Sequence, residues 1–104
     1  MSSPSSNLHV GSFVGTGSAL TIKNLPNKVK CLELYNVTSG DALYWQSSMA
    51  DASGVKQVAA GTRTFITSNG ITPYGAADGQ GFTLGADADL NVAAEVVHFR
   101  AWYE

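Results

Sequence analysis

The stretch Val96-Val97-His98-Phe99-Arg100-Ala101-Trp102-Tyr103-Glu104 closes the chain and decides the fold class. Its residues alternate in character from Val97 onward. One side holds Val97, Phe99, Ala101 and Tyr103, and the other holds His98, Arg100, Trp102 and Glu104. A period of two is that of a β-strand, because successive side chains of a strand point to opposite faces. We therefore expect a closing strand with Trp102 on the face opposite Phe99.

Short apolar groups separated by turn residues continue this pattern towards the N-terminus. Thr38-Ser39-Gly40-Asp41 predicts a tight turn, so the strands on either side of it form an antiparallel hairpin. Asn69-Gly70 predicts a second, two-residue hairpin turn, since both residues tolerate positive φ. The strands expected from β-branched and aromatic content cover residues 20–23, 29–37, 42–46, 62–67, 81–85 and 97–104.

Three segments between these strands are less regular. Residues 47–61 are predicted to be a loop that leads into a strand, because Gly54 interrupts the pattern of a short helix. Residues 73–81 contain three glycines and one proline, which indicates an exposed loop. Residues 86–94 are either a turn or one or two helical turns, which Asp87 or Asp89 would cap.

Together these elements predict an all-β fold, an antiparallel β-sandwich or a small β-barrel, in a single domain over residues 19–104. Residues 1–18 are rich in serine and glycine and are predicted to form a flexible N-terminal arm. The arm either stays mobile or becomes ordered on assembly. The expected core consists of Leu20, Ile22, Leu32, Leu34, Trp45, Phe65, Phe82, Leu84, Val97 and Phe99.

The composition is that of a folded, mildly acidic protein. Of the 104 residues, 44% are apolar and 13% are charged, with a net charge of −2, which excludes a disordered acidic tail. The basic residues are spread singly and form no stripe for phosphates, so we expect no nucleic-acid partner. No apolar run approaches the roughly 18 residues of a membrane span, so we expect no membrane partner either.

Groups suited to catalysis are few. Cys31 is the only cysteine, which excludes an intrachain disulfide and a cysteine zinc site. A serine nucleophile needs a base and an orienting acid within hydrogen-bond distance, and the only histidines, His9 and His98, lie in the arm and in the closing strand. We therefore expect no enzyme activity, no catalytic residue and no cofactor.

Two short patterns imitate ligand or modification sites. Asp87-x-Asp89-x-Asn91 is similar to the start of a calcium loop, yet Val92 and His98 stand where such a loop has its glycine and its last glutamate. We expect no metal and predict a turn whose side chains bond nearby amides. Asn36-Val37-Thr38 matches the N-glycosylation acceptor pattern and carries no weight without a secretion signal.

The segment GFTLGADADLNVAAEVVHFRAW, residues 81–102, resembles the closing segment of small structural proteins of tailed bacteriophages. There a glycine-phenylalanine strand is followed by a turn with Asn-Val or Asn-Ala and by an alternating aromatic strand that ends in Ala-Trp or Ala-Phe. A glycine usually follows the Asn-Val-Ala turn, and this chain has Ala94 instead. Residues 34–38 with Tyr44-Trp45, and residues 61–64 through Gly70-Ile71, look like the same group, so the likeness covers residues 29–102.

This resemblance implies a phage virion structural protein, first of all a capsid decoration (cement) protein that binds the outer surface of the head and stabilises it. Its partners would be the major capsid protein and copies of itself, in a homo-oligomer such as a trimer. It would be made in the host bacterial cytoplasm and reside on the capsid surface of the virion. The residues expected at interfaces are Leu8, Val10, Phe13, Val14, Tyr74, His98, Arg100 and Trp102.

Two other functions stay open at this point. A tail, neck or fibre component of the virion shares the same small, charge-poor design. A carbohydrate-binding module is the second alternative, because sugar rings stack on exposed aromatic side chains. The aromatic residues available for such a platform are Tyr44, Trp45, Tyr74, Trp102 and Tyr103.

Overall fold

The computed structural model describes residues 8–103, apart from the side chain of Asn24, and these residues form eight β-strands. The strands are β1 (Leu8–Val14), β2 (Leu20–Leu25), β3 (Val29–Asn36), β4 (Ala42–Gln46), β5 (Ser53–Gln57), β6 (Arg63–Ala76), β7 (Gly79–Leu84) and β8 (Val96–Tyr103). All pair antiparallel in the order β1-β8-β3-β4-β5-β6-β7-β2, which confirms the all-β prediction. Within residues 8–103 no helix is long and apolar enough to cross a membrane.

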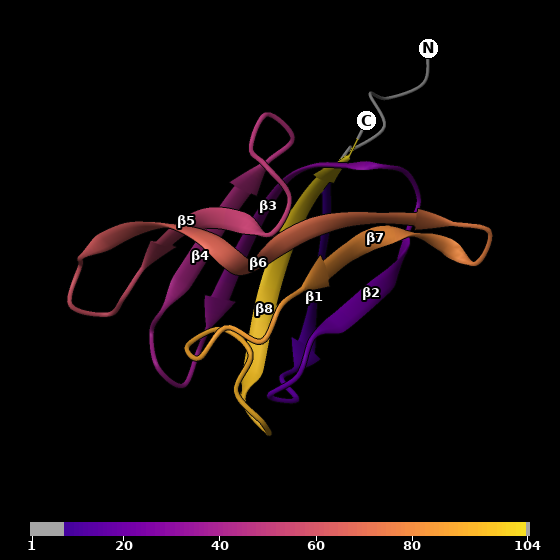
Figure 1. Ribbon diagram of the computed structural model, residues 1–104. Coiled ribbons are helices and arrows are strands. Elements are labelled where there is room, and N and C mark those ends of the chain that lie inside the picture. The colour runs from indigo at the N-terminus through magenta and orange to yellow at the C-terminus, as the bar shows by residue number, and fades with distance from the viewer. Residues whose placement is uncertain (1–7, 104) are drawn as a thin grey trace, which may run out of the picture.

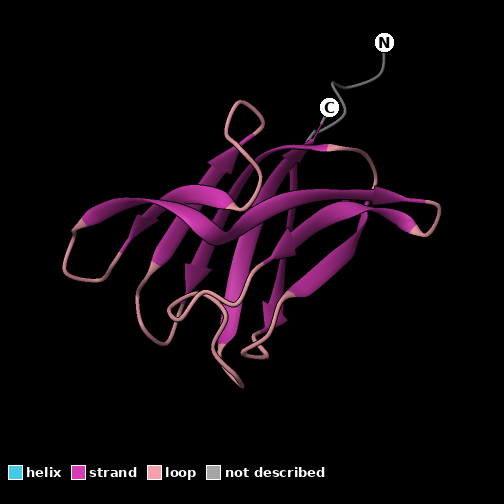
Figure 2. Ribbon diagram, viewed as in Figure 1, coloured by secondary structure: helices cyan, strands magenta, loops and turns pink. Residues whose placement is uncertain are grey.

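The sheet curls into two layers (Figures 1 and 2). The first layer consists of β1, β8, β3, β4, β5 and the first half of β6, and the second consists of the rest of β6 with β7 and β2. Strand β6 pairs with β5 mainly through residues 63–66 and with β7 through residues 71–76. It therefore carries the sheet from one layer to the other. Strands β1 and β2 are left as the two edges of an open barrel.

The core lies between the two layers. Phe82 of the second layer meets Phe99 of the first edge-to-face, with 5.4 Å between the ring centroids. Ile22 is only partly buried against this core, and Leu20 is partly exposed. The residues predicted for the core and found buried, each at most 6% exposed, are Leu32, Leu34, Trp45, Phe82, Leu84, Val97 and Phe99.

Phe65 is the exception among the predicted core residues, since its side chain is 56% exposed. Its neighbour Ile66 packs against the core instead. Successive residues of a strand face opposite sides of the sheet. An error of one residue in the predicted alternation therefore exchanges the sides to which Phe65 and Ile66 point. The aromatic character of Phe65 alone did not fix its side.

Strand β1 corrects the predicted boundary of the N-terminal arm. Residues 8–14 were expected to be flexible, but they pair with β8 without a register break, from Leu8 opposite Trp102 to Val14 opposite Val96. Phe13 packs on Phe82 and Phe99, with centroid distances of 6.3 and 6.2 Å. A serine- and glycine-rich composition says nothing about the backbone partners that β8 offers. Residues 1–7 of the predicted arm lie outside the described residues.

The predicted hairpin turn at Asn69-Gly70 is wrong, because β6 runs through both residues. Asn69 does adopt a positive φ of 60°, as expected for this pair. The positive φ falls where the strand exchanges β5 for β7 as its partner. A Cβ on Gly70 would collide with the carbonyl oxygen of Ser53, so glycine is required at this junction.

The irregular segments also differ in part from expectation. The predicted loop over residues 73–81 is instead the hairpin of β6 and β7, which turns at Ala77 and Asp78. The predicted loop over residues 47–61 contains β5. The turn after β3 and the strand over residues 42–46 are confirmed.

Residues 86–94 form turns rather than a helix. The predicted turn whose side chains bond nearby amides is confirmed, because Oδ1 of Asp87 accepts hydrogen bonds from the amides of Asp89 and Leu90 at 2.9 and 3.0 Å. Ala94 adopts a φ of 68°, a conformation that suits glycine better than alanine. This is the position at which the phage segment usually has a glycine.

Candidate functional site

The candidate functional site is the solvent-facing side of the first layer, which we call the outer face. One row of paired residues crosses all six of its strands and consists of Val10, Arg100, Glu33, Tyr44, Val55 and Phe65. The neighbouring row consists of Ser12, His98, Tyr35, Ala42, Gln57 and Arg63. Both rows alternate with the buried residues of the same strands, so their side chains point away from the core.

The exposed large apolar side chains of residues 8–103 all belong to this face or its rim. Val10 is 65% exposed, Val14 55% and Phe65 56%, and the others are Leu8, Tyr35, Val37 and Val96. Three valines gather at one end, where Val14 pairs with Val96 and the carbonyl of Val96 accepts a hydrogen bond of 3.3 Å from the amide of Val37. Apolar surface collected on one side of a small domain marks a contact site.

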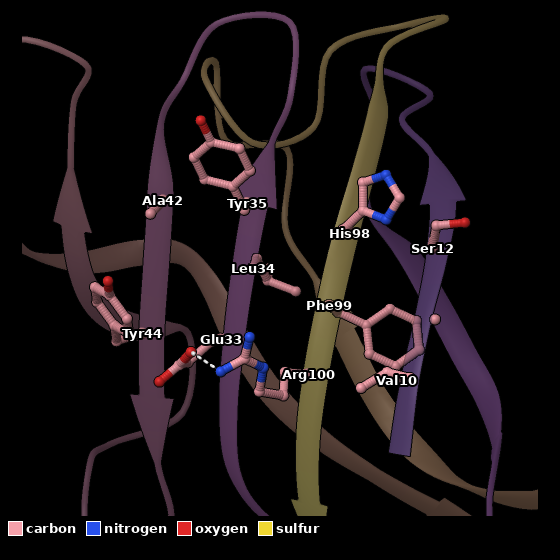
Figure 3. A pocket seen from close by; sticks show the side chains of 11 residues that line it. Val10, Ser12, Glu33, Leu34, Tyr35, Ala42, Tyr44, His98, Phe99 and Arg100 are labelled. Carbon is pink, nitrogen blue, oxygen red and sulfur yellow. Dashed lines mark ion pairs between the residues drawn. The ribbon is translucent and has the colours of Figure 1, made fainter. Parts of the chain in front are cut away.

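A shallow groove of about 520 Å³ crosses the middle of the outer face. Figure 3 shows its lining, with Val10 and Ser12 on one flank and Tyr44 on the other. Between them Arg100 and Glu33 form an ion pair of 3.8 Å across β8 and β3. Both side chains are about half exposed, so the pair adds little stability. The two charges remain accessible to a partner.

A second groove of about 420 Å³ lies on the same face and shares Glu33 and Tyr44 with the first. Tyr44, Trp102 and Tyr103 line it together. Trp45 also borders it but is only 3% exposed and donates its indole N–H to the carbonyl of Ala50 at 3.2 Å. Tyr74 lies in the second layer. The five aromatic residues considered for sugar stacking therefore do not form one platform.

Most of the predicted interface residues meet on the outer face. Phe13 and Tyr74 do not, because Phe13 points into the core side of β1 and Tyr74 donates its hydroxyl to Asp78 at the β6–β7 hairpin, 2.7 Å away. The residues brought together are Leu8, Val10, Val14, His98, Arg100 and Trp102.

Sequence reasoning missed Tyr35, Val37, Phe65 and Val96 as members of this face. A signal for the first two was present, since residues 29–37 carry apolar side chains on both sides of the strand. A strand of this kind is either covered on both sides or exposes one apolar side. The structure shows the second case.

The outer surface of the second layer is polar by comparison. Thr21, Thr83 and Thr72 form a row across β2, β7 and β6, and the hydroxyls of Thr21 and Thr83 lie 2.9 Å apart. At the end of this layer Lys23 contacts Asp78 at 2.8 Å. This hydrogen bond and the charge of Asp78 raise the pKa of Lys23, while the bonds from Lys23 and Tyr74 lower the pKa of Asp78.

The sequence that imitates a calcium loop is held by a lysine. Lys56 of β5 places its ammonium 3.1 Å from Asp87 and 2.8 Å from Asp89. Burial acts to lower the pKa of Lys56, but the hydrogen bonds and charges of the two carboxylates outweigh it, and the pKa is raised. Asn91 is used elsewhere, donating to the carbonyls of Ser18 and Gly85 at 2.7 and 2.9 Å. The loop is thus tied to its surroundings by protein groups.

Asn36 of the glycosylation pattern is fully buried. Its Nδ2 donates to the carbonyl of Asp89 at 2.8 Å and to Glu95 Oε1 at 2.9 Å, and its Oδ1 accepts from the amide of Thr38 at 2.9 Å. All of its polar atoms therefore have partners. The side chain joins the β3–β4 turn to the loop before β8 through these hydrogen bonds. Because it is buried, it is not accessible to a modifying enzyme in the folded domain.

Comparison with known proteins gives no match to a family model, to a curated protein or to a solved structure.

Proposed function

We propose that the protein is a bacteriophage virion structural protein, a capsid decoration protein that lays its outer face on the surface of the head. The proposal is carried by one observation: the exposed apolar side chains lie on the outer face, whereas the outer surface of the second layer is polar. Interfaces combine such an apolar centre with aromatic and arginine anchors. Tyr35, Trp102 and Arg100 would be the anchors here.

The phage-like segment supports the proposal through its place in the fold. Residues 81–102 cover most of β7, the loop after it and most of β8. Strand β8 contributes His98, Arg100 and Trp102 to the outer face. Lys56 and Asn36 bind this loop through Asp87 and Asp89, and Asn91 of the loop donates to the carbonyl of Ser18. A loop with several such contacts suits a protein that stabilises a shell under outward pressure.

The first experiment is quantitative mass spectrometry of virions purified from the phage that encodes this protein. A copy number comparable to that of the major capsid protein is expected for a decoration protein. A copy number that is a small fraction of it would assign the protein to the tail or neck. Absence from the particle would overturn the virion assignment.

A binding experiment tests the face itself. Undecorated heads are incubated with the full chain and sedimented, and the bound fraction is measured against concentration. Tyr35→Glu introduces a charge in the middle of the outer face and is expected to weaken binding at least tenfold. Ala76→Glu introduces the same charge on the exposed end of β6 in the second layer and serves as the matched control. Equal binding by both variants would contradict the proposed face.

A further inference from the structure

The two edges of the sheet differ in their protection against pairing with another strand. Edge strand β2 carries Lys23, has a register break between Asn24 and Leu25, and is followed at once by Pro26. Charges, bulges and prolines are the means by which natural edges avoid further pairing. Edge strand β1, Leu8–Val14, has none of these within its residues, and its register with β8 is unbroken. It is an open edge.

The free backbone groups of β1 follow from its pairing with β8. The amide of Gly15, just after the strand, donates to the carbonyl of Glu95 at 2.8 Å. In an antiparallel pair the residues bonded to the neighbour alternate along the strand. Gly11 and Phe13 therefore bond to β8, and the N–H and C=O groups of Val10, Ser12 and Val14 point away from it.

We propose that β1 pairs antiparallel with β1 of a second copy of this chain, about a twofold axis at Gly11. This register overlaps all seven residues of the strand. It sets Val10 opposite Ser12 of the second copy and Leu8 opposite Val14, with each Gly11 facing the other. The backbone groups that pair next to the axis are those of Val10 and Ser12, which point away from β8.

The strand itself argues for a second copy as the occupant. It contains no Asp, Glu, Lys or Arg, so no like charges oppose each other in the twofold register. The pairs on the solvent side join apolar or small residues, and they unite the outer faces of both copies into one surface. A ring in which β1 pairs with β2 of the next copy is disfavoured, because Lys23 and the bulge interrupt β2. A twofold pair replaces the trimer expected from the resemblance.

The proposal concerns the free protein and does not depend on capsid binding. The experiment is analytical ultracentrifugation of the full chain over a wide concentration range. The wild-type protein is expected to form a dimer and no larger species. Val10→Glu is expected to weaken the dimer at least tenfold, because it brings two carboxylates close to the axis. Within one copy the new carboxylate faces Arg100, its cross-strand neighbour, which keeps the monomer folded.

Thr21→Glu on edge strand β2 is the matched control and is expected to leave the dimer unchanged. A wild-type protein that stays monomeric at every concentration would overturn the proposal. So would a dimer that persists in Val10→Glu, or an oligomer that Thr21→Glu dissolves. Circular dichroism and thermal melting of each variant establish that it is folded before its association is compared.

The register has its own test. Residues opposite each other in a hydrogen-bonded antiparallel pair have Cα atoms about 5.5 Å apart, within the range of a disulfide. Chains with Val10→Cys and chains with Ser12→Cys, both with Cys31→Ser, are mixed and oxidised. Mixed cross-linked dimers in excess over either homodimer are expected. Cross-linking with no preference for the mixed product would contradict the register.

Discussion

The two layers of this domain present opposite surfaces to solvent. The first layer exposes Val10, Tyr35 and Phe65 and ends at the uncharged edge β1. The second layer shows a row of threonines and ends at β2, with Lys23 paired to Asp78. Both layers contribute apolar side chains to the core between them. The difference teaches that the outward-facing residues, rather than the core, distinguish the two sides of the molecule.

Strand β8 offers the largest contrast, between its two sides. Phe99 is 6% exposed and touches Phe82, so Phe99→Ala is expected to cost about 3–5 kcal/mol of unfolding free energy. Trp102→Ala, on the outer face, is expected to cost less stability but to weaken capsid binding at least tenfold. Urea unfolding and sedimentation measure the two effects. A larger stability loss from Trp102→Ala with intact assembly would reverse the assignment of the faces.

Substitution of two glycines tests how closely the chain packs at each edge strand. A Cβ on Gly81 of β7 would collide with the carbonyl oxygen of Ile22, a backbone atom that has no room to move. A Cβ on Gly11 of β1 would lie 2.9 Å from the Phe99 ring, a side chain that can shift. Gly81→Ala is therefore expected to cost about 3 kcal/mol, and Gly11→Ala about 1 kcal/mol. Thermal and denaturant unfolding of both variants checks the order, which equal losses would contradict.

Lys56 ties the first layer to the loop before β8, and its effect depends on pH. Because its folded pKa is raised above 10.5, its contribution is complete below that value and is lost as the pH rises through the folded pKa. The unfolding free energy of the wild-type protein is expected to fall more between pH 9 and pH 12 than that of Lys56→Met. Parallel pH curves for the two proteins would show that the ammonium does not hold Asp87 and Asp89.

The smallest effect is expected at Lys23 and Asp78 in the second layer. The lowered pKa of Asp78 means that the pair contributes only above the acid range and is lost as the pH falls. Since both side chains are about half exposed, a double-mutant cycle with Lys23→Ala and Asp78→Ala is expected to give a weak coupling that high salt removes. A strong coupling that persists at high salt would contradict this expectation and would show that the ion pair stabilises the second layer.

The regular strands could be predicted from sequence because their patterns are local. Alternation predicted the faces of β8 from Val97 to Trp102, although Tyr103, expected on the side of Phe99, lines the outer groove beside Trp102. The turn at residues 38–41 predicted the β3–β4 hairpin. The course of β6 could not be predicted, because Asn69 adopts a positive φ in this bent strand just as it would in a hairpin turn. Only the position of β5 and β7 on its two halves decides between them.

The candidate site was predictable in part for the same reason. His98, Arg100 and Trp102 follow from the alternation of β8 alone. The sequence predicts Val10 and Val14 at an interface, but as parts of an arm. The pairing of residues 8–14 with 96–102 joins the two ends of the sequence, so no local pattern reveals it. The prediction that Phe65 lies in the core is wrong, because the side to which its side chain points depends on the tertiary partners of β6.

The most direct test of β1 as the open edge of the sheet is amide hydrogen exchange of the free protein at low and high concentration. The amides of Val10 and Ser12 are expected to become protected as concentration rises, while those of Gly11 and Phe13 are protected throughout by β8. The amides of Thr21 and Ile22 on edge strand β2 are expected not to change. Exchange at Val10 and Ser12 that is independent of concentration, or protection that grows at β2 instead, would contradict the assignment of β1 as the edge that meets a partner.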